Sequence, residues 1–184
     1  QLSHDTGIKF RMFPMFIKAT SLALMKYPLL NSILNENKME TVEHGAHNIG
    51  IAIDTSTGLV VPCIKDVQDK TIYDIHADLQ EIIKLSKNSQ IPTELLTGTT
   101  FSLSNVGSIG GRTAFPRIVS PQVGIGALGQ SYLTPQLKYN KLVNTSILPV
   151  SWSADHRIID GATLARFNAH IKNIMEDPKT LLKE

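Results

Sequence analysis

The segment SWSADHRIIDG, residues 151–161, joins an apolar strand to the last helix of the chain. Apolar and β-branched residues from Asn144 to Trp152 predict the strand. Apolar residues at helical spacing predict the helix, from about Asp160 to Met175. The polar side chains of the segment thus stand between two regular elements, where a rigid scaffold commonly positions residues for binding or catalysis.

On the amino-terminal side of this segment, the spacing of apolar residues predicts two more long helices and several strands. A broad apolar face predicts a helix that starts near Pro14 and ends before Tyr27-Pro28. Residues Ile72 to Ser86 repeat apolar side chains at helical spacing, and Thr71 with Asp74 predicts a capping box at their start. The predicted strands are residues 47–54, 59–64, 99–105, 123–128 and 144–152.

These elements predict an α+β fold in which one large mixed β-sheet is flanked by helices, because no regular βαβα alternation occurs. Residues 47–54 and 59–64 should pair as a hairpin. Pro62 removes a ladder donor, so the second of these strands should lie at an edge or contain a bulge. We expect residues 1–184 to form one domain.

The composition excludes several classes of protein. With 42% hydrophobic and 18% charged residues, the chain matches a folded domain rather than a disordered one. A net charge of +2, without runs of Lys or Arg among aromatics, predicts no nucleic-acid partner. No apolar run approaches the ~20 residues of a membrane span, so no membrane partner is expected. The single cysteine, Cys63, excludes an internal disulfide, and no ligand-type cluster predicts a metal site.

His156 is the candidate general base. An imidazole of near-neutral pKa takes a proton from a thiol and returns it to a leaving thiolate. Asp160, four residues later, is placed to hold the local geometry through a salt bridge or to cap the last helix. A solvated loop with ordinary capping explains the same spacing, so on spacing alone both interpretations stay open.

Ser104 is the candidate oxyanion donor. It lies in FSLSNVG, residues 101–107, where a hydroxyl at a strand end precedes a glycine-rich turn. Such polar strings are more often ordinary turns. The loop Gly107–Gly111 lacks the lysine of a phosphate-binding loop and the spacing of a dinucleotide site, which favours close backbone packing. Cys63 lies in an apolar strand with no charged neighbour before Lys65, which favours a buried structural thiol over a nucleophile.

Three ordered motifs resemble one known family. HRIIDG, residues 156–161, has the pattern His-x-x-x-Asp-Gly, and residues 151–167 resemble the signature of the dihydrolipoyl acyltransferases of 2-oxo acid dehydrogenase complexes. FSLSNVGSIGG, residues 101–111, resembles the family's second signature, and residues 47–54 with 58–62 resemble a third segment. The resemblance spans residues 7–177. VSWSADH (150–156) and VGIGALG (123–129) are most similar to the branched-chain members.

The resemblance implies transfer of an acyl group, of the branched-chain type, between dihydrolipoamide and coenzyme A. It implies His156 as general base, Ser104 as donor to the tetrahedral oxyanion, and Asp160 as a structural or catalytic support. Direct transfer in a ternary complex is expected, without an acyl-enzyme. Arg11 stands where relatives place a coenzyme A contact, although a surface arginine is an equal alternative. The other implied contacts to coenzyme A are Asp54, Ser104, Asn105 and Gly129.

The resemblance also implies an assembly and a fold like that of chloramphenicol acetyltransferase. Similar enzymes form trimers that build a hollow cube, with His156 of one subunit facing Ser104 of its neighbour across the trimer interface. We expect residues 1–184 to be the catalytic core without its amino-terminal helix and strand, and without the lipoyl and peripheral-subunit-binding domains. A separate lipoyl domain would then deliver the lipoyl group. The decarboxylase and dihydrolipoyl dehydrogenase components would bind through the absent domains.

The closest-looking relatives imply a mitochondrial matrix location. Four residues depart from the family's usual types and are expected to alter assembly or the shape of the channel: Arg112, Phe115, Arg117 and Gln122.

Two alternatives remain open. A non-catalytic core paralogue would be expected to lose the histidine or the serine, and this chain has both. A small-molecule acetyltransferase like chloramphenicol acetyltransferase shares the His-x-x-x-Asp-Gly motif, but the serine-containing signature weighs against it. A serine or cysteine hydrolase is less favoured than either, since the sequence lacks a Gly-x-Ser-x-Gly elbow.

Overall fold

The structure is a computed structural model that describes residues 12–38, 40–56, 58–88, 90–178 and 181, and in these residues a six-stranded sheet carries three α-helices. The strand order is β10-β7-β6-β3-β4, and β5 also pairs with β3. The parallel strands are β3 (Ile49–Thr55), β6 (Phe101–Asn105) and β7 (Gly124–Leu128). The antiparallel strands are β4 (Gly58–Val60), β5 (Cys63–Ile64) and β10 (Val150–Ala154). The sheet is mixed, which confirms the predicted α+β class.

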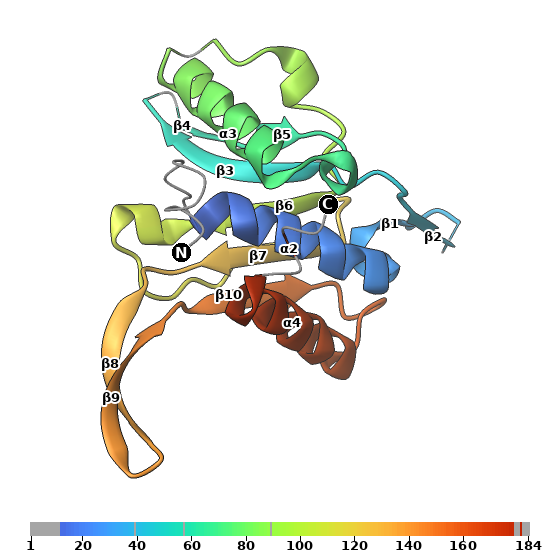
Figure 1. The fold of residues 1–184 in the computed structure, drawn as a ribbon. Helices are drawn as coiled ribbons and strands as arrows, with labels where there is room; N and C mark the ends of the chain where they lie inside the picture. Colours follow the sequence, from blue (N-terminus) through green and yellow to red (C-terminus); the bar gives the residue numbers. More distant parts are fainter. Residues whose placement is uncertain (1–11, 39, 57, 89, 179–180, 182–184) are drawn as a thin grey trace.

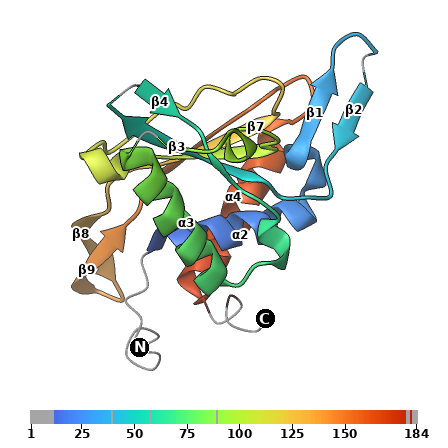
Figure 2. The same ribbon diagram turned by 90° about the horizontal axis from the view of Figure 1, so that it is seen from above.

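The three helices lie side by side on one face of the sheet (Figures 1 and 2). They are α2 (Met12–Lys26), α3 (Ile72–Lys87) and α4 (Gly161–Glu176). Because α2 lies between the other two and on the sheet, its apolar residues from Phe16 to Leu24 are largely buried. Among the described helices, none is long and apolar enough to cross a bilayer.

The core beneath α2 and α4 is built on aromatic rings that need a glycine in the sheet. The Trp152 ring lies 5.0 Å from that of Phe167, 6.0 Å from Phe16 and 6.3 Å from Phe101. Gly126 is the register partner of Trp152, and a Cβ at position 126 would overlap the indole ring. A side chain at this position would therefore displace the Trp152 ring from this aromatic cluster.

We expect Gly126→Ala to lower the free energy of unfolding by about 2 kcal/mol, because the added methyl overpacks a filled core. Urea denaturation would measure the change. Gly161→Ala is the matched control: no atom lies within 4 Å of its Cβ position, and it begins α4, so alanine there should stabilise by about 0.5 kcal/mol or less. Equal effects of the two changes would contradict this description of the core.

Two local predictions are confirmed. Thr71 caps α3: its Oγ1 accepts from the N–H of Asp74 (3.2 Å), and the Asp74 carboxylate accepts from the N–H of Thr71 (3.0 Å). The chain that pairs with β3 is interrupted at Pro62, so it forms two short strands, β4 and β5. The carbonyl oxygen of Pro62 still accepts a hydrogen bond from the N–H of Ile51 (2.7 Å).

The prediction of one strand from Asn144 to Trp152 is wrong. The chain forms β9 (Lys141–Ile147), bends at Leu148-Pro149 and starts β10 at Val150. Pro149 has no N–H to donate, and its carbonyl accepts instead from the N–H of Gly129 (2.9 Å). β9 pairs with β8 (Tyr132–Lys138) in a separate two-stranded sheet, which we call the β8–β9 arm (residues 132–147). The arm projects from the body of the molecule (Figure 1).

A second hairpin stands at the opposite end of the molecule (Figures 1 and 2). After the 3-10 helix η1 (Pro28–Asn31), β1 (Ser32–Asn35) pairs with β2 (Glu40–Glu43), and neither strand was predicted because both are short and largely polar. The remaining short 3-10 helices are η2 (Val67–Asp69), η3 (Thr93–Leu95) and η4 (Val106–Ile109).

Candidate active site

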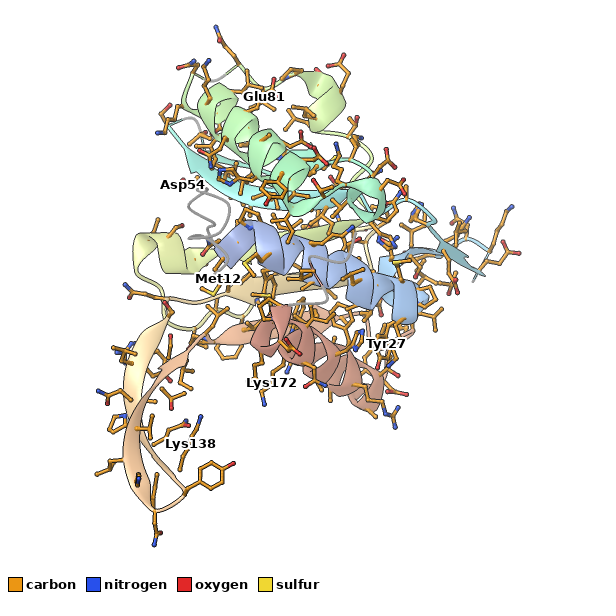
Figure 3. The ribbon with its side chains drawn as sticks, viewed as in Figure 1. Met12, Tyr27, Asp54, Glu81, Lys138 and Lys172 are labelled. Atoms are coloured by element: carbon orange, nitrogen blue, oxygen red, sulfur yellow. The ribbon has the colours of Figure 1, made fainter. Side chains whose placement is uncertain are left out.

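A cavity of about 690 Å³ lies at the edge of the sheet where the parallel strands β3, β6 and β7 end. This edge is the usual ligand position in sheets of parallel strands. Met12 of α2 and Asp54 of β3, both labelled in Figure 3, line the cavity. The cavity is also lined by all of the predicted coenzyme A contacts that the structure describes: Asp54, Ser104, Asn105 and Gly129.

The lining of the cavity is mostly apolar, and Asp54 is the one charged residue among the described residues that line it. Helix residues contribute apolar side chains, among them Phe13, Leu79 and Ile83. No Lys, Arg or His occurs among the described lining residues. Such a surface suits an elongated neutral ligand with amide groups better than it suits a phosphate.

Ser104 projects from the face of the sheet that the helices do not cover. Phe101 and Leu103 alternate with it in β6 and are buried in the core, so Ser104 lies on the other face. Its register partners are Ala52 and Ala127, and it is half-buried. Because both neighbours are alanines, no bulky side chain of an adjacent strand covers the hydroxyl.

The glycine-rich loop after Ser104 packs backbone against backbone, as expected. A Cβ at Gly107 would overlap the carbonyl group of Gly129, and a Cβ at Gly129 would overlap the carbonyl group of Arg112. The N–H of Gln130 donates to the Gly111 carbonyl at 2.7 Å. The N–H of Gly129 already donates to the carbonyl oxygen of Pro149. A ligand would therefore contact Gly129 through its carbonyl oxygen and its Cα.

His156 lies at the opposite end of the sheet from Ser104 within one chain. Ser104 and Ser151 both pair with Ala127, so they are level across the sheet, and His156 follows five residues later. At ~3.3 Å per residue an extended chain of five residues spans about 16 Å along the strands. His156 is exposed in the turn after β10 and is not among the residues that line the cavity.

Arg157 fixes the turn that carries His156. Its guanidinium donates to both carboxylate oxygens of Asp155, at 2.7 Å from Nη2 and 3.0 Å from Nε, and its Nη1 donates to Glu36 at 2.9 Å. Hydrogen bonds from Arg157 lower the pKa of Asp155. Sequence reasoning missed this clamp, because Glu36 lies in the distant β1–β2 hairpin and only the fold brings it here.

Asp160 caps α4, which was one of its two predicted roles. Its Oδ1 accepts from the N–H of Thr163 at 2.6 Å. Hydrogen bonds from Thr163, the backbone one first, lower the pKa of Asp160, and the carboxyl group itself is exposed. The cap fixes where α4 begins, four residues after His156.

The other residues singled out in the sequence have simpler surroundings. Cys63 is buried, with its Sγ 3.6 Å from the Thr97 carbonyl oxygen, which confirms the structural interpretation. Buried Gln122 accepts from Ser102 at 2.7 Å. The Arg112 guanidinium stacks 4.8 Å from the Tyr132 ring centre, and Phe115 and Arg117 are exposed.

Arg11 lies outside the described residues. In the described part of the chain, no three His, Cys, Asp or Glu side chains come together as a metal site.

A family model described as 2-oxoacid dehydrogenases acyltransferase (catalytic domain) matches residues 1–183. The chain belongs to this family. The lipoamide acyltransferase component of the branched-chain alpha-keto acid dehydrogenase complex of Mus musculus is 45% identical over 177 residues, covering 96% of this chain and 37% of that protein. The dihydrolipoyllysine-residue acetyltransferase component of the Staphylococcus epidermidis pyruvate dehydrogenase complex is 37% identical over 184 residues, covering 100% of this chain and 42% of that protein. The chain therefore spans less than half the length of these relatives.

Solved structures of this family share the fold. The Azotobacter vinelandii dihydrolipoamide acetyltransferase has a TM-score of 0.90 at 29% identity, and the match covers 98% of this chain and 74% of that one. The cubic core of a pyruvate dehydrogenase multienzyme complex has a TM-score of 0.89 at 30% identity, with the same coverage. A chloramphenicol acetyltransferase matches with a TM-score of 0.57 at 14% identity, covering 95% and 81%. This last match confirms the expected fold and nothing beyond it.

In this acyltransferase-family chain, the candidate site residues therefore form two groups. Ser104 lies with Asp54, Asn105 and Gly129 at one end of the sheet. His156, its clamp and its helix cap lie at the other end.

Proposed function

We propose that the chain transfers an acyl group between dihydrolipoamide and coenzyme A, as the catalytic core of a 2-oxo acid dehydrogenase complex. The observation that carries the proposal is the single cavity that Asp54, Ser104, Asn105 and Gly129 line together. These four residues come from three separate motifs, and a common role in binding one ligand explains their meeting.

The spacing of the reactive residues supports the same chemistry. A serine, a histidine and an asparagine of the Azotobacter protein were investigated for their roles in its catalytic mechanism. That serine precedes the histidine by 52 positions and the asparagine follows it by four, and Ser104, His156 and Asp160 have the same two separations. The third residue is aspartate here, and Asp and Asn are about equally good as helix N-caps.

The reaction needs one base and one hydrogen-bond donor. His156 removes the proton from the attacking thiol, whose pKa near 8.5 leaves it mostly protonated at pH 7. The thiolate sulfur bonds to the thioester carbonyl carbon, and the Ser104 hydroxyl donates a hydrogen bond to the resulting oxyanion. The bond to the leaving sulfur then breaks, and this thiolate takes the proton back from His156. No acyl-enzyme forms.

The cavity fits the neutral parts of both substrates. The pantetheine arm of coenzyme A and the lipoyl arm are elongated, with amide groups that donate to acceptors such as Asp54 and Asn105. The phosphates of coenzyme A would need cations from outside the described lining, since the cavity offers a carboxylate instead.

A complete site would require two copies of the chain. Because Ser104 and His156 lie at opposite ends of one chain, a head-to-tail contact is the arrangement that brings them together. Heterologous contacts of this kind close into rings. A trimer built this way, assembling further as in the cubic core that shares the fold, is the quaternary structure we propose.

A branched acyl group is the proposed substrate. The mouse branched-chain relative is 45% identical, against 37% for the Staphylococcus epidermidis acetyltransferase component. The names of the branched-chain relatives also support a mitochondrial location, although the bacterial relative is similar along the whole chain. We propose that a separate lipoyl domain delivers the acyl group, and that the decarboxylase and dihydrolipoyl dehydrogenase components bind outside residues 1–184.

The test compares isobutyryl-, isovaleryl- and acetyl-coenzyme A as donors to free dihydrolipoamide. We expect the branched donors to have kcat/KM values about tenfold above the acetyl donor, because each methylene in a fitted pocket changes discrimination by that order. Preference for the acetyl donor would overturn the branched assignment, and no transfer from any donor would overturn the activity. Acylated protein trapped with a donor alone would contradict direct transfer.

Asp160 gives a prediction that separates capping from acid–base chemistry. Asp160→Asn should keep most of the activity because Asn also caps a helix, whereas Asp160→Ala should lose about tenfold by misplacing His156. Folding lowers the pKa of Asp160, so its ionised carboxylate stabilises the folded state. This stabilisation is fully present above the ordinary aspartate pKa of about 3.9 and is lost as the pH falls through the lowered pKa of the folded state. Thermal unfolding from pH 7 to 3 would show whether the Asn variant is less sensitive to acid.

A further inference from the structure

The turn that carries His156 is anchored at both of its ends and exposed between them. At its start, the N–H of Asp155 donates to the carbonyl oxygen of Val123 at 2.8 Å, and at its end Ile159 is buried in the core. His156 and Arg157 lie between these anchors and are exposed. The direction in which the imidazole points therefore depends on what holds the exposed part of the turn.

Arg157 joins two carboxylates from distant parts of the chain. Its Nε and Nη2 donate to the two carboxylate oxygens of Asp155 at 3.0 and 2.7 Å, and its Nη1 donates to Glu36, 121 positions away in the sequence, at 2.9 Å. Hydrogen bonds to Asp155, and after it to Glu36, raise the pKa of Arg157. All three guanidinium nitrogens thus donate to carboxylates, an arrangement that needs the planar fork of an arginine.

The two carboxylates restrain the turn in different ways. Asp155 belongs to the turn itself, so its contact with Arg157 moves with the turn. Glu36 follows β1 in the β1–β2 hairpin, so its contact fixes the guanidinium against another part of the fold. Through Arg157, the hairpin therefore restrains the segment that carries the histidine.

The hairpin that supplies Glu36 is registered on the same stretch of chain as the turn. Ile33 of β1 forms a bridge with Gln122, and the next residue, Val123, provides the carbonyl oxygen that accepts from Asp155. Adjacent residues of one strand thus place both carboxylates. The distance between the carboxylates is set by the sheet, which is the most rigid part of the fold.

Hydrogen bonds at both ends of the hairpin hold its shape. At its base, the side-chain amide of buried Asn31 donates to the carbonyl oxygens of His44 and Ala46 at 2.8 and 3.0 Å. In the turn after β1, the side chain of Asn35 accepts from the N–H of Lys38 at 3.3 Å. The glutamate in this turn is therefore presented from an ordered element.

Stability alone does not explain this network. The side chains of Arg157 and Glu36 are 57% and 70% exposed, and exposed ion pairs contribute little because water and salt screen them. Catalysis is far more sensitive to position, since a displacement of about 1 Å lowers a rate roughly a hundredfold. A contact that is weak in energy is therefore strong in effect when it directs a reacting group.

We propose that Glu36 is a positioning residue for His156. It holds Arg157 against the β1–β2 hairpin, and Arg157 and Asp155 together keep the turn in the direction in which the imidazole reaches the substrate thiol. The inference rests on the proposed function, because it takes His156 as the base. It deepens that function by giving a role to a residue outside the three sequence motifs.

The first test measures thioester exchange between isobutyryl-coenzyme A and dihydrolipoamide at pH 7. Glu36→Ala should lower kcat about tenfold and leave both KM values unchanged, because it misdirects the base and leaves the binding cavity intact. Glu36→Gln should lower kcat only about twofold, since the amide oxygen still accepts from Nη1. Glu40→Ala removes another exposed carboxylate of the same hairpin and should keep normal kcat.

A double-mutant cycle tests whether Glu36 acts through Arg157. Arg157→Ala should lower kcat about thirtyfold, because the turn then loses both carboxylate contacts. Adding Glu36→Ala to this variant should cause no further loss, since the guanidinium through which the glutamate acts is already absent. Arg157→Lys should not restore activity, because an ammonium group lacks the fork that joins the two carboxylates. Losses that multiply in the double variant would overturn the route through Arg157.

Hydrogen exchange gives a measurement that does not depend on turnover. The N–H groups of Ile158 and Ile159 donate to the carbonyl oxygen of Asp155 at 3.0 and 2.9 Å, so their exchange rates report how firmly the turn is held. Glu36→Ala should speed exchange in peptides that cover residues 156–160 by about fivefold, and Glu40→Ala should leave it unchanged. Thermal unfolding of both variants should match that of the unchanged protein.

The outcomes separate this inference from the proposed function. Normal kcat in Glu36→Ala, a loss confined to KM, a lowered unfolding temperature, or exchange no faster than in Glu40→Ala would each overturn the positioning role and leave His156 as the base. Unchanged turnover in His156→Ala would instead overturn the proposed mechanism, and the role of Glu36 with it.

Discussion

His156→Ala is expected to lower kcat/KM for acyl transfer about a thousandfold at pH 7, because the attacking thiol then has no base to remove its proton. The residual activity of the variant should rise with pH, since the substrate thiol, of pKa near 8.5, ionises without help. Initial rates of thioester exchange between acyl-coenzyme A and dihydrolipoamide, taken from about pH 6.5 to about pH 9, would measure both effects.

His76→Ala is the control for this variant, since His76 lies on α3 and is not among the cavity lining. It should keep normal activity. Unchanged turnover in His156→Ala would remove the histidine from the mechanism and favour a core protein without catalysis.

Ser104→Ala should lower kcat by roughly a hundredfold to a thousandfold with little change in KM, because the lost donor acts on the oxyanion and not on the bound substrate. Ser104 is half-buried in β6 between two alanines, so the change should leave the fold intact. Ser131→Ala removes another hydroxyl from the same lining and should have little effect. An equal loss in both variants would indicate a general effect of cavity polarity.

Mixing the two inactive variants tests whether the site is shared. A His156→Ala subunit still offers Ser104, and a Ser104→Ala subunit still offers His156. After dissociation and reassembly of an equal mixture, about a quarter of the head-to-tail sites should hold both groups and regain activity. Absence of any recovery would contradict a site built from two copies, whatever the activity of each variant alone.

The elements predicted from sequence carry local signals. α3 was predicted almost to the residue because its apolar spacing and the capping box of Thr71 and Asp74 both act within one helical turn. The interruption at Pro62 was foreseen for a similar reason, since a missing N–H affects the ladder wherever the strand pairs. Pro149 interrupts the ladder in the same way, but the apolar residues on both sides of it predict one strand, so the sequence pattern does not reveal the separation of β9 from β10 or the β8–β9 arm.

The sequence by itself determined the chemistry that is present: an imidazole in a turn, a hydroxyl at a strand end, an aspartate at a helix start and glycines that let two loops pack closely. Only the tertiary structure decided that Ser104 shares a cavity with Asp54, Asn105 and Gly129, and that His156 lies at the far end of the sheet. The reason is that parallel strands pair across long stretches of chain, and their register depends on the packing of whole faces. Local periodicity gives the face of each strand but not the neighbour beside it.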